Sequence, residues 1–306
     1  MNKILPLSEA VAKYVKSGAS LGFAGSGGRL SIAFAYEVIK QEKGDLSFVS
    51  AGTGAPCLDL LVGAKLVKRA EISFTMVTCL NIKRAVEGKK SRKDYRLLIE
   101  DYSNLAMSLR FFAGATKIPF IPIRSLAGSD LEKIRTFMGK EKMATMRSPF
   151  KDGTKVTVLP PSIPDVAVMH AQCADEEGNI LALGPAGSDG WLLRAAKKRI
   201  VTVEKIVSKQ YVKEHNVYTF LPGFMTDAVC EVPYGAHPYG LVDCYDLDAP
   251  FQKEFNTKSK TQEGFDEWAK EWVFGIYSRS DYLEKVGKET IARITNPKFA
   301  EDRLFE

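Results

Sequence analysis

The stretch SLGFAGSGGR, residues 20–29, joins a short apolar run to a glycine loop, and a helical pattern continues from it to Ile39. The same unit returns in LSFVSAGTGA, residues 46–55, which is followed by a helical pattern near 58–64. Strand, glycine loop and helix in alternation are typical of βαβ units, whose strands pair in parallel. These two units predict an α/β fold built on an open, largely parallel sheet with flanking helices.

Further along the chain, short runs of β-branched residues extend this pattern. Gly, Pro or Asp bounds each run, and helical patterns such as 190–198 alternate with them. The sequence contains no low-complexity linker and no repeat of fixed period, so we expect a single domain over residues 1–306. The expected strands are 72–74, 156–158, 166–169, 200–203 and 229–232.

Helical signals mark both ends of the chain. Near the N-terminus, Ser8 is expected to cap a helix that ends before Gly18. Near the C-terminus, Ser259 and Gln262 fit a capping box that opens a helical segment over about 259–295. A stripe of apolar residues follows near helical spacing, and we expect it to pack against the chain's own core or against a partner chain. Its members are Phe265, Trp268, Trp272 and Ile276.

The composition excludes several classes of protein. The 306 residues are 45% hydrophobic and 26% charged, and their formal charge of +6 is mild compared with that of nucleic-acid binders. The longest apolar stretches fall well short of the ~20 residues that span a bilayer, and the N-terminus lacks the pattern of a signal peptide. We therefore expect a soluble cytoplasmic protein that binds neither nucleic acid nor membranes.

The cysteines and histidines follow no disulfide or metal-binding pattern. The five cysteines include no C-x-x-C pair, and the three histidines lack metal-ligand spacing. Cys173 is interpreted as a small buried residue. His170 could be a general base at a strand end, although a structural histidine is the simpler interpretation. His237, in the turn 233–238, is interpreted as structural.

The glycine loops are the first candidates for a binding site. Residues 25–29 follow a strand of a parallel sheet, and their amides could approach an anion or a developing oxyanion. Leu30 stands where a dinucleotide fingerprint requires its third glycine, so that fingerprint is excluded. The alternative interpretation, a tight βα turn that binds no ligand, is equally consistent with the sequence. The loop 51–55 is a weaker candidate of the same kind.

A basic stretch supplies a second candidate. Residues 83–96 contain seven Lys or Arg in fourteen positions. They could attract the phosphates of coenzyme A or an acidic partner surface. A solvated helix face is the simpler interpretation.

Several blocks of the sequence, taken together, resemble one family. No block is specific alone, but they occur in order over essentially the whole chain, and the first half matches through the loop ending at Arg29 and the segment EDYS at 100–103. The combination resembles the A-type subunits of the family I coenzyme A-transferases, the family of glutaconate CoA-transferase. The later blocks are 165–172 running into 177–179, 222–229, 233–238, and 259–262 leading to 270–274.

The resemblance implies a mechanism and a partner. In this family a glutamate attacks an acyl-CoA, becomes a glutamyl-CoA thioester and passes the CoA to an incoming acid. That glutamate belongs to a B-type (beta) partner, and the nearest segment here, 176–179, falls in a block where A-type subunits form a turn. The chain is therefore expected to act only with a B-type partner, in a hetero-oligomer such as α2β2 or larger. Coenzyme A is its expected substrate, with no tightly bound cofactor and no metal.

The resemblance also assigns site residues. Asn104 stands where related transferases carry a glutamine that helps hold the oxyanion, and where a related steroid-ring hydrolase carries a glutamate base. Arg29 keeps its place and could meet a carboxylate bidentately or act as a structural clamp. The loop itself departs from the family's Gly-Gly-Phe at 24–26, so the acyl group and the acceptor acid are left open. The remaining expected substrate-binding residues are Gly25, Ser26, Gly27, Gly28, Gly52, Gly54 and Ser103.

Two other functions remain open at this point. A hydrolase, or an enzyme that cleaves or decarboxylates C–C bonds, could use the same fold on a CoA thioester. A non-catalytic scaffold or regulatory subunit could bind CoA esters without turning them over, and Gly25, Arg29 and Asn104 could then be altered without loss of turnover.

Overall fold

The computed structural model describes residues 2–52, 54–87 and 95–305. Within them nine strands form one sheet, whose parallel part has the order β12–β10–β8–β1–β2–β3–β4. The short strands β9 and β11 continue it in antiparallel pairing beside the end of β8. The expected open, largely parallel sheet is thus confirmed. Its strands are β1 (Ser20–Phe23), β2 (Leu46–Ser50), β3 (Val67–Ile72), β4 (Leu98–Asp101), β8 (Val166–Ala174), β9 (Ile180–Leu181), β10 (Lys198–Ile206), β11 (Thr219–Leu221) and β12 (Ala228–Glu231).

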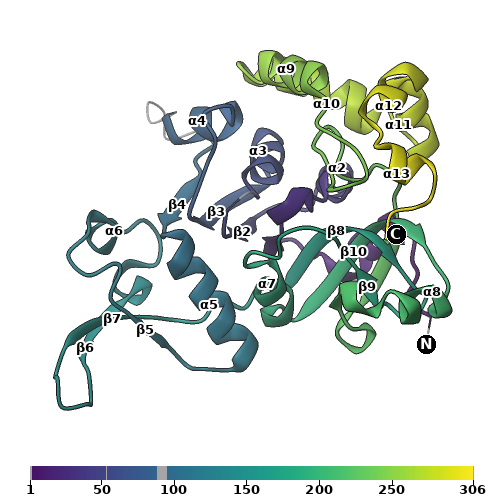
Figure 1. Cartoon of the computed structure of the whole chain (residues 1–306). Helices are drawn as coiled ribbons and strands as arrows, with labels where there is room; N and C mark the ends of the chain where they lie inside the picture. The colour runs from purple at the N-terminus through teal and green to yellow at the C-terminus, as the bar shows by residue number, and fades with distance from the viewer. Residues whose placement is uncertain (1, 53, 88–94, 306) are drawn as a thin grey trace.

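Helices cover both faces of this sheet (Figure 1). Alternate side chains of a strand point to opposite faces, so in β8 Val168 packs in one core cluster and Met169 in the other. The first cluster also holds apolar residues of α1 (Leu7–Tyr14), α2 (Ile32–Lys40), α3 (Ala55–Gly63) and α4 (Leu80–Glu87). The second holds residues of α5 (Asn104–Thr116) and α7 (Asp189–Ala195).

A smaller antiparallel sheet lies beyond the β4 edge (Figure 1). The expected strand 156–158 forms, but it belongs to this small sheet and not to the parallel one. Its neighbours decide this, because β7 pairs with β5 and β6 over its whole length. The elements here are β5 (Ile121–Ile123), α6 (Asp130–Lys133), the 3-10 turn Gly139–Lys142, β6 (Ala144–Arg147) and β7 (Lys155–Leu159).

The C-terminal helices pack on the layer formed by α2 and α3. The aromatic stripe is internal to the chain: Trp268 contacts Tyr36 edge to face at 5.7 Å between ring centroids, and Phe265, Trp272 and Ile276 share its cluster. The helices begin at Ala249, earlier than the expected residue 259. They are α9 (Ala249–Lys258), α10 (Gln262–Ala269), a π-helical turn (Lys270–Phe274), α11 (Arg279–Val286), α12 (Lys288–Ile294) and α13 (Pro297–Ala300).

Two expected helix caps are wrong. The side chain of Thr261 accepts the Gly264 N–H and caps α10, whereas Ser259 lies buried at the C-terminal end of α9. Helix α1 begins at Leu7, so Ser8 lies inside its first turn behind Pro6. The remaining short elements are α8 (Lys209–Glu214) and the 3-10 turns Ser26–Gly28, Asn216–Tyr218 and Gly223–Met225. None of the helices in the described part of the chain has the length and apolar character needed to cross a membrane.

Candidate functional site

Four loops gather at one edge of the parallel sheet. The carboxyl ends of parallel strands meet at the same edge, and ligands of open α/β sheets bind there. Strands β1 to β4 pair in this order, so the segments that follow them lie side by side. These segments carry the glycine loop 25–29, the described residues 51, 52, 54 and 55 of the second loop, Ser73, and the pair Ser103 and Asn104.

Hydrogen bonds join three of these loops. The Gly52 N–H donates to Ser73 Oγ at 3.1 Å, and the Ser73 hydroxyl donates to Asn104 Oδ1 at 2.5 Å. The sequence pattern predicts a strand over 72–74 that would include Ser73, but β3 ends at Ile72. Ser73 is therefore a site residue that the sequence analysis missed. Because Asn104 Oδ1 accepts this bond, its Nδ2 amide is left as the donating end of the side chain.

Asn104 opens helix α5 at the surface. Its neighbour Ser103 is the N-cap, and Ser103 Oγ accepts the Ala106 N–H at 3.1 Å. The amides of the first helical turn have no partner inside the helix, and the helix dipole adds partial positive charge there. The exposed Asn104 therefore adds a side-chain amide to a group of N–H donors. Such a group can stabilise a developing negative charge.

A buried ion pair supports the strand that leads to Asn104. Lys142 Nζ lies 2.9 Å from Glu100 Oε1, and neither side chain is exposed. The other Glu100 oxygen accepts N–H bonds from Thr136 and Met138. Burial raises the pKa of Glu100, but Lys142 and the two amides outweigh it and leave the pKa below its ordinary value. Glu100, the first residue of the EDYS segment, is thus held in place by an ion pair with a residue from a later loop.

The glycine loop is held from behind by a carboxylate. Asp189, the first residue of α7, accepts the Ser26 N–H at 2.9 Å and the Gly25 N–H at 3.4 Å. At Gly28, where φ is +79°, a Cβ would overlap the carbonyl of Gly240. The glycine there therefore permits close packing of two backbones. At Gly54, just before α3, a Cβ would overlap the Ser50 hydroxyl, so the glycine there permits close packing of the backbone on a side chain.

Arg29 has the contacts of a structural clamp. Its side chain is fully buried, and its guanidinium donates to the carbonyls of four residues. Its planar face also lies over the ring of Phe220, 4.8 Å from the ring centroid. Of the two roles left open by the sequence, these contacts favour the clamp over a bidentate contact with a substrate carboxylate. The carbonyls belong to Ser26, Leu183, Gly184 and Pro185.

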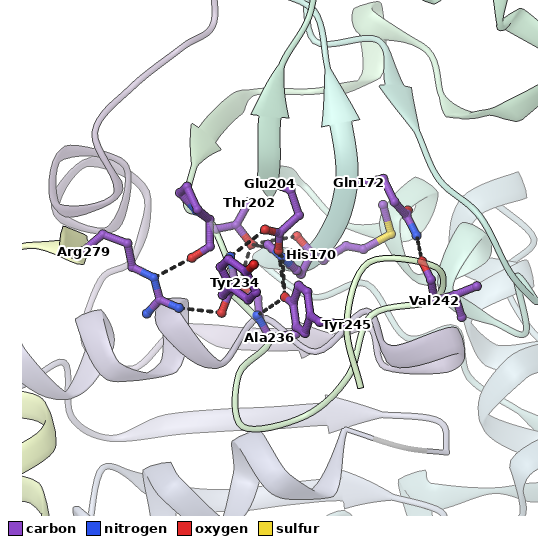
Figure 2. A network of polar contacts seen from close by, with 12 residues as sticks. His170, Gln172, Thr202, Glu204, Tyr234, Ala236, Val242, Tyr245 and Arg279 are labelled. Carbon is purple, nitrogen blue, oxygen red and sulfur yellow. Dashed lines mark hydrogen bonds and ion pairs between the residues drawn. The ribbon is translucent and has the colours of Figure 1, made fainter. Parts of the chain in front are cut away.

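His170 belongs to a buried network and not to a strand end (Figure 2). Strand β8 continues to Ala174 because β10 pairs along it to Ile206, which places His170 in its middle. Its Nε2 lies 2.5 Å from Glu204 Oε1, and its Nδ1 lies 2.8 Å from Thr202 Oγ1. The hydroxyl of Tyr245 donates to the same Glu204 oxygen. The network ties the 233–246 segment to the sheet and gives His170 a structural role.

His237, Cys173 and the segment 176–179 also make contacts that indicate structural roles. His237 is buried between Tyr282 and Asp248, and burial, opposed by Asp248, lowers its pKa to about 4. Cys173 is buried, as interpreted from the sequence, and burial raises the pKa of its thiol to about 12. The segment 176–179 forms a turn between β8 and β9, in which Glu176 and Glu177 pair with a lysine, Lys209.

The basic stretch is only partly within the described residues. Its central part, 88–94, lies outside them. In the described part, Arg84 donates to the Ser259 carbonyl and lies 3.2 Å from Gln262 Oε1, so it ties α4 to the start of α10. Lys83 lines a cavity of about 660 Å³ between α4 and the β3–β4 edge.

Comparisons with known proteins agree with this fold. A family model described as coenzyme A transferase matches residues 5–232. The chain is 34% identical to the A-type subunit of the glutaconate CoA-transferase of Acidaminococcus fermentans, over 94% of this chain and 92% of that one. The crystal structure of that glutaconate coenzyme A-transferase superposes with a TM-score of 0.88, covering 96% of this chain and 95% of the other at 33% identity.

Two further relatives carry different names. The chain is 30% identical to the A-type subunit of the 3-oxoadipate CoA-transferase of Pseudomonas knackmussii, over 94% of this chain and 99% of that one. It is 28% identical to one chain of the cholesterol ring-cleaving hydrolase of Rhodococcus jostii, over 94% of this chain and 96% of that one. The family model over residues 5–232 and the 34% identity over 94% of the chain lead to one conclusion: this chain belongs to the coenzyme A transferase family.

Proposed function

We propose that the chain is the A-type subunit of a heteromeric CoA-transferase that moves CoA between an acyl-CoA and a small carboxylic acid. The observation that carries this proposal is the amide group at the sheet edge. There the Ser73 hydroxyl orients the Asn104 side chain beside the N-terminus of α5. In the proposed reaction these donors stabilise the oxyanion that forms when a glutamate carboxylate attacks the thioester carbonyl.

The nucleophile is proposed to come from a B-type partner. The segment 176–179, the nearest counterpart of a glutamate–glycine motif, is a hairpin turn whose two glutamates pair with Lys209. The site also lies open, since Asn104 is exposed and its neighbours Leu105 and Phe74 are 53% and 48% exposed. We propose an assembly such as α2β2, in which the partner closes this edge. The cytoplasm is the proposed compartment, because the five cysteines are buried free thiols.

Chemical trapping tests this assignment. The complex of this chain with its B-type partner is incubated with acyl-CoA, then treated with borohydride or hydroxylamine and digested for mass spectrometry. We expect a modified glutamate on the partner only, and no modification without acyl-CoA. An adduct on this chain would show that the nucleophile has been misplaced.

The same preparation separates the proposal from its main alternative. A hydrolase would release free CoA and acid at the same rate whether or not an acceptor acid is present. A transferase requires the acceptor and yields a new acyl-CoA. The hydrolase relative makes this comparison worthwhile, although Asn104 lacks the basicity of the glutamate expected in such an enzyme.

A further inference from the structure

One buried carboxylate at the site has no part in the proposed chemistry. Asp189 is 1% exposed and lies directly behind the glycine loop. It accepts the Gly25 and Ser26 amides and lies 3.3 Å from the Ser26 hydroxyl. Hydrogen bonds from N–H groups to an ionised carboxylate are about twice as strong as bonds between neutral groups. The conformation of the loop that follows β1 therefore depends on one side chain that comes from a distant part of the sequence.

A second contact joins the same two segments. Arg29, at the end of the glycine loop, donates to the carbonyls of residues 183–185, just before Asp189. Its Nη1 lies 3.9 Å from Asp189 Oδ2. At Gly187, where φ is +51°, a Cβ would overlap the Ser26 hydroxyl. The glycine loop is thus fixed against the 183–189 segment through Gly25, Ser26 and Arg29.

We propose that Asp189 is a positioning residue that sets the conformation of the glycine loop in the transferase site. The inference rests on the proposed function, and it takes the loop 25–29, at the same sheet edge as Asn104, to be part of the substrate-binding site. Asp189 acts through Gly25 and Ser26 and does not itself touch the reacting atoms.

The charge on Asp189 separates this role from simple packing. Burial raises the pKa of Asp189 to about 6, although Arg29 and the loop amides act in the opposite direction. Because the folded pKa lies above the unfolded value, this group favours folding most below about pH 4, and that contribution is lost as the pH rises through about 6. Arg29 is the charged residue that faces it among the described residues. The ionised form of Asp189 holds the loop best, but the folded chain is less stable with Asp189 ionised than with Asp189 protonated.

Because the pKa of Asp189 is raised, turnover and stability should change in opposite directions with pH. Between about pH 5 and 7 the ionisation of Asp189 should tighten the loop and raise turnover, while its contribution to stability falls. A purely structural residue would change stability and activity in the same direction. The amide introduced by Asp189→Asn cannot ionise, so this substitution removes the charge while it keeps the size and one acceptor oxygen.

The test uses the assembled complex with its B-type partner. We expect Asp189→Asn to lower kcat/KM at pH 7.5 by about tenfold or more, the usual effect of losing a hydrogen bond to a charged group. Its Tm should stay equal or rise. The acidic limb that we expect near pH 6 in the wild-type profile should disappear. An unchanged kcat/KM with an unchanged acidic limb would overturn the inference.

Asp165→Asn is the matched control. Asp165 also accepts a backbone amide and a hydroxyl, both from Ser20, at 2.9 and 3.0 Å. It lies at the opposite end of β1, away from the glycine loop. The control should leave kcat/KM and its pH profile unchanged.

Hydrogen exchange gives a readout that does not need turnover. Amide exchange in peptides covering residues 24–30 should be faster in Asp189→Asn than in wild type, and unchanged in Asp165→Asn. If the wild-type complex shows no transferase activity but exchange responds in this way, the proposed function fails while the positioning of the loop stands. If exchange does not respond, Asp189 does not hold the loop and the inference fails.

Discussion

Asn104→Asp is expected to lower kcat and kcat/KM together by about 10²-fold or more, the usual cost of losing an oxyanion donor, with KM little changed. One carboxylate oxygen would keep the bond from the Ser73 hydroxyl, so the side chain should stay in place. The other oxygen would replace the donating Nδ2 and would face the charge that develops on the thioester oxygen. The variant therefore keeps the geometry of the site and reverses its electrostatics.

Two further variants grade this effect. Asn104→Ala removes the side-chain donor but keeps the backbone amides of the first turn of α5. Its loss should therefore be smaller than that of Asn104→Asp, at or below about 10²-fold. Ser73→Ala should cause a smaller loss of turnover than either Asn104 variant, because the Asn104 amide remains but is no longer oriented by the Ser73 hydroxyl. The loss of turnover should therefore be largest in Asn104→Asp, smaller in Asn104→Ala and smallest in Ser73→Ala. This order is specific to an amide that donates to the transition state.

Steady-state kinetics of the complex measure these differences. Asn216→Asp makes the same change at an exposed asparagine in a turn and controls for the added charge. If Asn104→Asp keeps the full transferase rate, or raises only thioester hydrolysis, the oxyanion role is wrong and the hydrolase alternative gains. A rise in KM with kcat unchanged would make Asn104 a substrate-positioning residue.

The repeated strand–loop–helix pattern was sufficient to predict an open, largely parallel sheet, but not all of its strands. The runs 20–24 and 46–50 became β1 and β2, and the segments that follow them lie at the same sheet edge as Asn104. Local signals carry this information, because alternation of short strands and helices determines which pairings are possible. The family resemblance placed Asn104, which composition and spacing alone do not distinguish from other polar residues.

Contacts between distant residues could not be predicted in this way. Ser73 was missed because Phe74 continues the strand pattern, whereas β3 ends at Ile72, opposite the last residues of its neighbours β2 and β4. Asp189 was missed because its partners lie more than 160 residues earlier in the chain. Ser259 and Thr261 are both acceptable N-caps by residue type, but Ser259 is taken up by the C-terminal end of α9, so Thr261 caps α10.

Lys142→Met is expected to lower the free energy of unfolding by about 3–5 kcal/mol, the usual cost of removing one partner of a buried ion pair. Lys142 and Glu100 are both fully buried, and the change would leave the Glu100 carboxylate without a counter-charge. The Lys142 ammonium also donates to the Ile134 carbonyl at 2.9 Å and lies 5.1 Å from the centroid of the Tyr102 ring. Its loss should therefore loosen the 134–142 segment and the end of β4 together.

Thermal unfolding of the complex should show this as a fall in Tm of about 5–10 °C for a chain of this size. Lys258→Met is the control, because its pair with Glu267, at 3.1 Å, is exposed and should contribute less than about 1 kcal/mol. The double variant Glu100→Gln with Lys142→Met should recover part of the loss, because no unpaired charge then remains buried. A double variant as unstable as the sum of the two single ones would mean that the residues act independently. The strand end that carries Ser103 and Asn104 would then owe its position to packing, with no share from the ion pair beneath it.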